Sequence, residues 1–259
     1  MAALTAICRR DASLKCENAS VNALDLVAID RTDDRFATVY HRLLEPSFPP
    51  DQLDSLADLS ASAAKGRADF LVAVEADGTP IGVAVGEWYA DSRVQLLAYL
   101  AVDPDHRSAG VGGRLLDAAV ERWALKHGPC VVVTEIEHPE LPAEHPEWGD
   151  PKRRFAFYAR HGARVLDLPF FQPALRDSSE REQGMLLVSL HIDQSFQVDD
   201  GRIASAPIHE FLTGYFTATE GRVPDDRDGA ALLRAARNPD GIALTDLPQA
   251  DIGELPRIA

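Results

Sequence analysis

The stretch Arg107-Ser108-Ala109-Gly110-Val111-Gly112-Gly113 follows an apolar segment, residues 94–102, and opens a run with helical periodicity. In that run the apolar side chains recur every three or four residues and share one face, while charged side chains share the other. This glycine-rich turn, residues 107–113, is therefore predicted to join a strand to an amphipathic helix. The apolar face consists of Val111, Leu115, Leu116, Ala119, Val120 and Trp123.

The glycine-rich turn has the chemistry of a diphosphate site. The first turn of a helix leaves backbone N–H groups without partners, and the helix dipole makes that end positive. Glycines remove the side chains that would keep a diphosphate away from those donors. Arg107 and Arg114 add charge-assisted hydrogen bonds. The sequence thus predicts a diphosphate held without a metal; the alternative is a tight turn that binds nothing.

The segments around the turn predict a mixed sheet. Residues 70–75, 81–89 and 94–102 are strand-like and are separated by turn sequences, which favours an antiparallel meander. Residues 130–136 are almost wholly apolar and follow the helix, as expected for a buried parallel strand reached by a crossover.

The remaining segments give the expected domain organisation. Residues 24–29, 163–168 and 185–192 are predicted strands. The predicted helices are one capped by Asp33 or Asp34 that carries Phe36 to Leu44, one capped by Asp51 that ends at Gly66, one capped by Asp150 that ends at Gly162, and residues 207–219 and 227–237. We expect a flexible lead-in over residues 1–22, one domain over 23–192, and a helical extension with a loosely ordered tail over 193–259.

Composition excludes several classes of protein. The chain has 259 residues, 46% hydrophobic and 26% charged, as in ordinary soluble globular proteins. Its formal net charge of −15 disfavours binding to nucleic acid. No segment approaches the roughly 20 apolar residues that span a membrane, and the N-terminus has the wrong charge order for a secretory signal. The three cysteines lack paired spacing, so neither a disulfide framework nor a zinc site is expected, and we predict a cytoplasmic protein.

Two motifs together resemble those of the GCN5-related N-acetyltransferase (GNAT) superfamily. Leu100-Ala101-Val102-Asp103-Pro104, followed by the glycine-rich turn, is similar to motif A of that superfamily. Phe157-Tyr158-Ala159-Arg160-His161-Gly162-Ala163 is similar to its late Phe-Tyr-x-x-x-Gly-Phe helix end, with Ala163 in the usual aromatic place. The motifs occur in the expected order, and the resemblance covers residues 24–192.

The resemblance implies a fold and a donor. The fold is α/β (α+β), with a mixed, mostly antiparallel central sheet that is splayed in the middle and flanked by helices, and with a short helical C-terminal extension. The donor is acetyl-CoA, or another acyl-CoA, held in the splay. The implied cofactor-binding residues are Leu100, Ala101, Val102, Arg107, Ser108, Ala109, Gly110, Val111, Gly112, Gly113 and Arg114.

Acetyl transfer to an amine needs a base for the amine, stabilisation of the oxyanion and an acid for the thiolate. Tyr158 occupies the family's general-acid position; the alternative is a tyrosine that only packs. Glu135 and Glu137 alternate along the end of the buried strand, so both point the same way, and desolvation of either would suit a base. Glu135 is preferred because it lies deeper, and His138 and Glu87 are further candidates. The alternative for each is a solvated position at a strand end, and many acetyltransferases use only a water chain to a distant carboxylate.

Several nearby residues have open roles. No asparagine lies between Glu137 and Phe155, where many relatives place one against the pantetheine. Lys152, Arg153 and Arg154 are expected either to capture an acceptor carboxylate or ribose phosphate, or to be solvated. A second set is expected either to line the acceptor pocket or to cover the edge of the sheet: Phe170, Phe171 and Gln172. A third set has side chains of the types that bind metal ions: His138, Glu140, Glu144 and His145. The prolines among them leave no rigid scaffold, so no metal site is predicted.

The sequence therefore predicts an N-acyltransferase that uses acetyl-CoA and a small-molecule amine. Two alternatives stay open: a non-catalytic CoA-binding module, and a transferase fed by an acyl carrier protein or an aminoacyl-tRNA. No membrane partner is expected, nucleic acid is disfavoured, and a homodimer is compatible with the sequence, which does not determine the oligomeric state.

Overall fold

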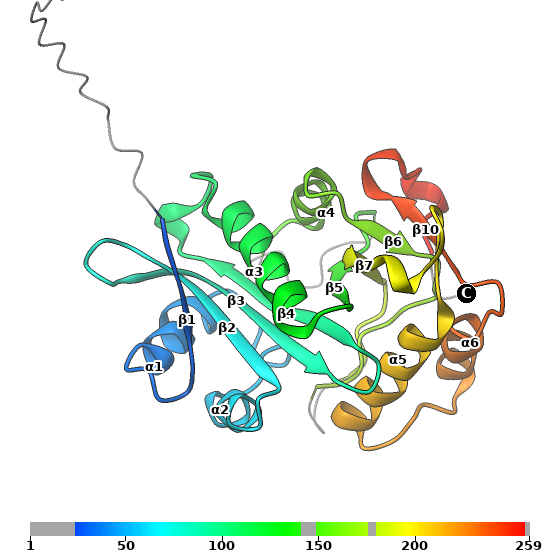
Figure 1. Ribbon diagram of the computed structural model, residues 1–259, viewed down its shortest axis with the longest axis horizontal. Helices are drawn as coiled ribbons and strands as arrows, with labels where there is room; N and C mark the ends of the chain where they lie inside the picture. The colour runs from blue at the N-terminus through cyan, green and yellow to red at the C-terminus, as the bar shows by residue number, and fades with distance from the viewer. Residues whose placement is uncertain (1–23, 141–148, 176–179, 257–259) are drawn as a thin grey trace, which may run out of the picture.

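Figure 1 shows the computed structural model, which describes residues 24–140, 149–175 and 180–256. The expected lead-in over residues 1–22 lies outside the described residues. One ten-stranded sheet runs through the molecule in the order β1-β2-β3-β4-β5-β7-β6-β10-β9-β8. Its strands are β1 (Asp25–Ile29), β2 (Ala68–Val74), β3 (Pro80–Tyr89), β4 (Val94–Val102), β5 (Val131–Glu137), β6 (Arg164–Leu166), β7 (Met185–Ile192), β8 (Gln197–Asp199), β9 (Arg202–Ile203) and β10 (Ile242–Asp246).

The sheet is mixed and mostly antiparallel, which confirms the predicted fold class. Strands β1 to β4 form the expected meander, each antiparallel to the next. The helix α3 (Val111–His127) then crosses over to β5, which pairs with β4 in parallel. On its other side β5 pairs antiparallel with β7.

Strands β4 and β5 separate part-way along their length. Their pairing runs from Val94 opposite Val131 to Leu97 opposite Thr134 and goes no further. Strand β4 nevertheless continues to Val102 and β5 to Glu137. The diverging ends of both strands line a cleft of about 960 Å³. The splay implied by the family resemblance is thus present in the sheet.

The helices cover both faces of the sheet. Along β5, Val132 and Ile136 pack in a core cluster with α3, whereas Val131 and Val133 pack in a second cluster with the C-terminal helix α5. Because alternate residues of a strand point to opposite faces, α3 and α5 lie on opposite sides of the sheet (Figure 1). The other helices of the described residues are α1 (Phe36–Val39), the π-helical turn η1 (Tyr40–Leu44), α2 (Leu56–Ala64), α4 (Pro151–Arg160), α5 (Ser205–Glu220) and α6 (Arg227–Ala235). The described residues also form the short 3₁₀ turns η2 (Pro104–His106), η4 (Gln194–Phe196), η5 (Leu247–Gln249) and η6 (Ile252–Glu254).

Helix caps decide where α4 begins and ends, as predicted. The Asp150 carboxylate accepts a hydrogen bond from the Lys152 amide at 2.9 Å, and Pro151 is the first helical residue. Gly162 follows the helix with a φ of +72°, a conformation that favours glycine.

Two predicted caps are wrong. Helix α2 starts at Leu56 with Ser55 as its cap, not Asp51, because the chain before it is tethered to two tyrosines: the Tyr40 hydroxyl donates to the Asp54 carbonyl and the Asp54 amide donates to the Tyr99 hydroxyl. Likewise α1 has no side-chain cap, and the Asp33 carboxylate binds Arg35 instead.

The prediction of a loosely ordered tail from Asn238 is wrong for the described residues. Strand β10 pairs antiparallel with β6 on one side and with β9 on the other, so the C-terminal segment is helical only in part and extends the sheet. Leu247 and Leu255 are buried in the same core cluster as α3. The prolines and aspartates of this segment therefore bound a short strand and turns. No helix among the described residues has the length and apolarity needed to cross a bilayer.

Arg181 fastens α5 and α6 to the connection before β7. Its guanidinium forms ion pairs with Glu220 and Asp226, both at 2.6 Å, and lies 4.9 Å from the centre of the Phe171 ring. Replacing Arg181 with methionine keeps much of the packing but leaves the largely buried Glu220 carboxylate without its partner. We expect the free energy of unfolding, measured by urea denaturation, to fall by about 1–3 kcal/mol.

The matched control for Arg181 is Arg222, whose pair with Asp225 is 3.5 Å long and exposed on both sides. Replacing Arg222 with methionine should change the free energy of unfolding by less than about 0.5 kcal/mol, as for most exposed ion pairs. Equal losses from the two variants would contradict the role assigned to Arg181.

Candidate active site

A cleft of about 960 Å³ passes through the sheet where β4 and β5 separate. From the α3 side it is lined by Arg107, Gly112, Phe157 and Tyr158. From the opposite side it is lined by Asp54, Arg67, Glu87, Tyr89, Tyr99, Gln172 and Tyr215. The cleft thus joins the glycine-rich turn to a pocket with acidic and aromatic side chains on the other face of the sheet.

Glu135 lies in this cleft at the end of β5. Its Oε2 accepts two hydrogen bonds, one from Gln172 Nε2 at 2.7 Å and one from the Tyr215 hydroxyl at 3.2 Å. Its Oε1 is buried and accepts no hydrogen bond within the described part of the chain. Burial raises the pKa of this carboxyl to about 7, although the two hydrogen bonds oppose the shift. Glu135 can therefore exchange a proton near neutral pH.

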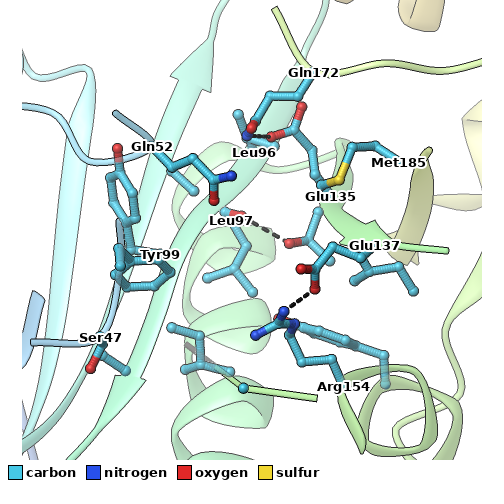
Figure 2. A pocket seen from close by; sticks show the side chains of 18 of the residues that line it. Ser47, Gln52, Leu96, Leu97, Tyr99, Glu135, Glu137, Arg154, Gln172 and Met185 are labelled. Atoms are coloured by element: carbon cyan, nitrogen blue, oxygen red, sulfur yellow. Dashed lines mark hydrogen bonds and ion pairs between the residues drawn. The ribbon is translucent and has the colours of Figure 1, made fainter. Parts of the chain in front are cut away.

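Glu137 lines the same cleft but has a different environment. Its carboxylate forms an ion pair with the Arg154 guanidinium from α4, and Figure 2 shows this pair below Glu135 and Gln172 on the same wall of the cleft. The Arg154 guanidinium therefore occupies the Glu137 carboxylate, whereas Oε1 of Glu135 accepts no hydrogen bond from the described residues. Of the two carboxylates, Glu135 has the chemistry expected of a base.

Tyr158 reaches the cleft from α4 and is buried. Burial raises the pKa of its hydroxyl to about 12, while contact with the Thr134 side chain opposes the shift. The neighbouring Phe157 ring packs against it edge-on at 5.1 Å between centroids. The hydroxyl consequently stays protonated at neutral pH and can donate a hydrogen bond or a proton into the cleft.

The glycine-rich turn leads into α3 and leaves the first amides of the helix without helical partners. Gly110 precedes the helix with a φ of +79°, and the Arg114 amide, donating to the Gly110 carbonyl at 3.1 Å, makes the first helical hydrogen bond. The amides of residues 111–113 therefore have no partner within the helix. Arg107 lines the cleft beside them, with its Nε donating to the Val102 carbonyl at 3.2 Å.

Two neighbouring glycines have different surroundings. A Cβ on Gly113 would lie 2.9 Å from the His161 ring, so this glycine lets α3 and α4 pack closely. A Cβ on Gly112 would meet Val102 at 3.4 Å and Phe157 at 3.9 Å, which is ordinary contact. Gly112 lies on the cleft, whereas packing alone accounts for Gly113.

The metal interpretation finds no support in the described chain. His138 is buried and Glu140 is exposed, while Glu144 and His145 lie outside the described residues. Within residues 24–140, 149–175 and 180–256, no three histidine, cysteine, aspartate or glutamate side chains are grouped so that they could hold a metal ion.

Comparison with known families matches residues 66–162 to the model of the acetyltransferase (GNAT) domain. The chain contains a GNAT domain. The matched segment runs from β2 through the glycine-rich turn to the end of α4, and it includes Glu135 and Tyr158. The predicted resemblance is confirmed.

Two solved structures are similar to the chain, and the first of them supports the fold. A proposed GNAT-family acetyltransferase from Bacteroides thetaiotaomicron is 23% identical, with a TM-score of 0.51, over 66% of this chain and 88% of that chain. A proposed acetyltransferase from Acinetobacter baylyi is 14% identical, with a TM-score of 0.48, over 68% of this chain and 97% of that chain. No curated protein sequence matches the chain.

The GNAT domain brings only part of the predicted cofactor-binding set to the cleft. Leu100, Ala101, Val102, Arg107 and Gly112 line it. The remaining predicted residues do not line the cleft: Ser108, Ala109, Gly110, Val111, Gly113 and Arg114. The Arg114 side chain is exposed. Of the basic residues at the start of α4, all three line the cleft: Lys152, Arg153 and Arg154.

The pocket on the α5 side was largely missed from the sequence. Phe170 and Phe171 are buried in the core, whereas Gln172 lines the cleft. Tyr215 lies outside the GNAT match and was not predicted at all. The signal was present, because Tyr215 is the one residue with a polar group on the otherwise apolar buried face of α5, which comprises Ile208, Phe211, Leu212, Tyr215 and Phe216.

Proposed function

We propose that the protein is an N-acetyltransferase that transfers the acetyl group of acetyl-CoA to the amine of a small molecule. The GNAT domain supports acetyl transfer in general. The observation that carries the finer proposal is Glu135, a carboxyl with a pKa of about 7 in the same cleft as the protonated hydroxyl of Tyr158. These are the base and the acid that the reaction needs.

The donor side of the proposal rests on the α3 face of the cleft. The Gly112 amide, which has no partner within the helix, lies on the cleft beside the Arg107 guanidinium, and together they suit the diphosphate of acetyl-CoA. Beyond Leu97, β4 no longer pairs with β5, so its backbone from Leu100 to Val102 can bond the pantetheine and the thioester carbonyl. The Arg107 contact comes from a side chain, and the other contacts use main-chain groups that the sheet and the turn hold in place.

The proposed reaction is a direct transfer. Glu135 takes a proton from the ammonium group, and the amine nitrogen then bonds to the thioester carbonyl carbon. An amide of β4 stabilises the oxyanion of the tetrahedral intermediate. As the carbon–sulfur bond breaks, Tyr158 donates its proton to the departing sulfur. The acylated nitrogen then loses its remaining extra proton, which returns to the Tyr158 phenolate, and the proton on Glu135 leaves to solvent. The products are an N-acetylated amine and CoA.

The acceptor side favours a cationic amine. Asp54 and Glu87 lie on this wall of the cleft with Tyr89 and Tyr99, and the tyrosine rings can face a cation. Burial and the nearby Asp54 carboxylate raise the pKa of Glu87, so a positive ligand would offset repulsion between these groups. The amine of such a ligand is protonated at neutral pH, which is why the reaction requires a base.

The test combines binding with turnover. Calorimetry with CoA measures donor binding, and release of CoA thiol from acetyl-CoA in the presence of a panel of small amines measures transfer. Amine-dependent thiol release with a matching acetylated product supports the proposal. Tight CoA binding without release for any amine would point to the non-catalytic CoA-binding module, and no CoA binding would refute both functions.

Replacing Tyr158 with phenylalanine tests the proposed acid. The ring and its packing against Phe157 are kept, and only the hydroxyl is lost. We expect kcat to fall about 100-fold, as for loss of a general acid, with CoA affinity and melting temperature nearly unchanged. If Tyr158 only packs, the variant will retain the wild-type kcat.

A further inference from the structure

Two hydrogen-bond donors from outside the GNAT match converge on one carboxylate oxygen. Gln172 lies between β6 and β7, and Tyr215 lies on α5 in the C-terminal segment, both beyond residue 162. Each donates to Oε2 of Glu135, at 2.7 Å and 3.2 Å. Figure 2 shows the Gln172 amide against this oxygen.

Both donors are themselves held firmly. Tyr215 is 3% exposed. Its ring packs against the Phe211 ring, with 5.5 Å between the ring centroids, and against the Tyr89 ring, with 6.0 Å between the centroids. The Gln172 backbone forms a pair of hydrogen bonds with Glu182, both 3.0 Å long. Donors fixed in this way restrict rotation of the carboxylate plane.

The arrangement leaves the two carboxylate oxygens with different tasks. Oε2 is occupied by two donors, whereas Oε1 is buried and accepts no hydrogen bond from the described residues. Since a buried acceptor without a donor is costly, Oε1 is the atom that gains most from a ligand N–H.

We propose that Tyr215 and Gln172 are positioning residues that fix the Glu135 carboxylate so that Oε1 receives the proton of the acceptor amine. This inference rests on the proposed function. It gives the C-terminal segment a part in the active site, because α5 supplies one of the two donors. A GNAT domain without that helix would hold Glu135 by Gln172 alone.

The expected effect has a definite sign. A hydrogen bond donated to a carboxylate favours its charged form, so losing the Tyr215 hydroxyl raises the pKa of Glu135 above about 7. In the Tyr215→Phe variant, the acid limb of kcat/KM should move about one pH unit upward. At a pH on that limb kcat/KM then falls about tenfold, with a much smaller change on the alkaline plateau.

The control is Tyr40→Phe, which also removes a buried hydroxyl. The Tyr40 hydroxyl donates to the Asp54 carbonyl at 3.0 Å, and its side chain does not line the cleft. Its acid limb should coincide with that of the wild type. A Gln172→Leu variant, which removes the other donor without altering α5, should shift the limb in the same direction as Tyr215→Phe.

A direct titration separates this inference from the proposed function. The full chain labelled with ¹³C at glutamate carboxyl carbons is titrated by NMR, and the Glu135 resonance is assigned by its loss in Glu135→Gln. An upward shift of its pKa in both Tyr215→Phe and Gln172→Leu is expected. Unchanged titration and an unchanged acid limb in both variants would overturn the inference even if the wild type transfers acetyl groups. A wild type that acetylates no amine refutes the proposed function, whatever the titration shows.

Discussion

Replacing Glu135 with glutamine is expected to lower kcat/KM for the amine by about 10²–10⁴-fold, the range for loss of a general base. The wild-type kcat/KM should rise with pH through about 7, because Glu135 accepts a proton only when it is deprotonated. In the Glu135→Gln variant this acid limb should disappear. Steady-state rates of thiol release across the pH range check both expectations.

The matched control is Glu137→Gln, on the same strand and in the same cleft. Because Glu137 is paired with Arg154, its loss should reduce kcat/KM by less than about tenfold and should leave the acid limb in place. Calorimetry should show CoA binding to both variants with wild-type affinity. If the two variants lose activity equally, or if Glu137→Gln removes the limb, Glu135 is not the base.

Replacing Gly112 with aspartate should weaken CoA binding by about 100-fold or more, which is the loss of several charge-assisted hydrogen bonds. There is space for the side chain, since a Cβ at this position meets its neighbours at 3.4 Å or more. The new carboxylate would lie at the positive end of α3, where the diphosphate is proposed to bind, and would compete with it. Calorimetry with CoA measures the loss.

Two comparisons make this test specific. Pantetheine lacks the diphosphate, so its binding to β4 should be nearly unchanged in Gly112→Asp. The Gly201→Asp variant adds the same charge at an exposed turn, where the nearest atom to a new Cβ is 3.7 Å away, and should bind CoA as the wild type does. Equal weakening of CoA and pantetheine would indicate a damaged cleft, and unchanged CoA binding would remove the diphosphate from this turn.

Local sequence patterns predicted most of the GNAT fold because each depends on neighbouring residues. The turn between β2 and β3 and the cap of α4 at Asp150 are both encoded within a few positions. Strand β10 was missed because it is short and pairs with β6, which lies far away in the sequence. Nothing within residues 242–246 indicates that partner.

The residues of the candidate site could likewise be predicted only in part. Glu135 and Glu137 could be assigned to one cleft from strand alternation, but only the fold reveals that Arg154 pairs with one and Gln172 with the other. The Tyr215 contact could not be predicted, because it requires α5 to pack on the face of β5 that carries Glu135. Contacts between distant elements are absent from local patterns.

The position of β7 between β5 and β6 determines how the chain can be divided. A fragment that ended with the family match at residue 162 would lack β7, and the backbone of residues 131–137 would become an open sheet edge. Extending the fragment to residue 192 would restore that edge but expose the next one, since β6 would have lost β10. Leu255 is buried and completes the core. We infer that recombinant fragments that end before about residue 255 would self-associate through their unpaired strands. The domain is therefore best produced with its C-terminal segment intact.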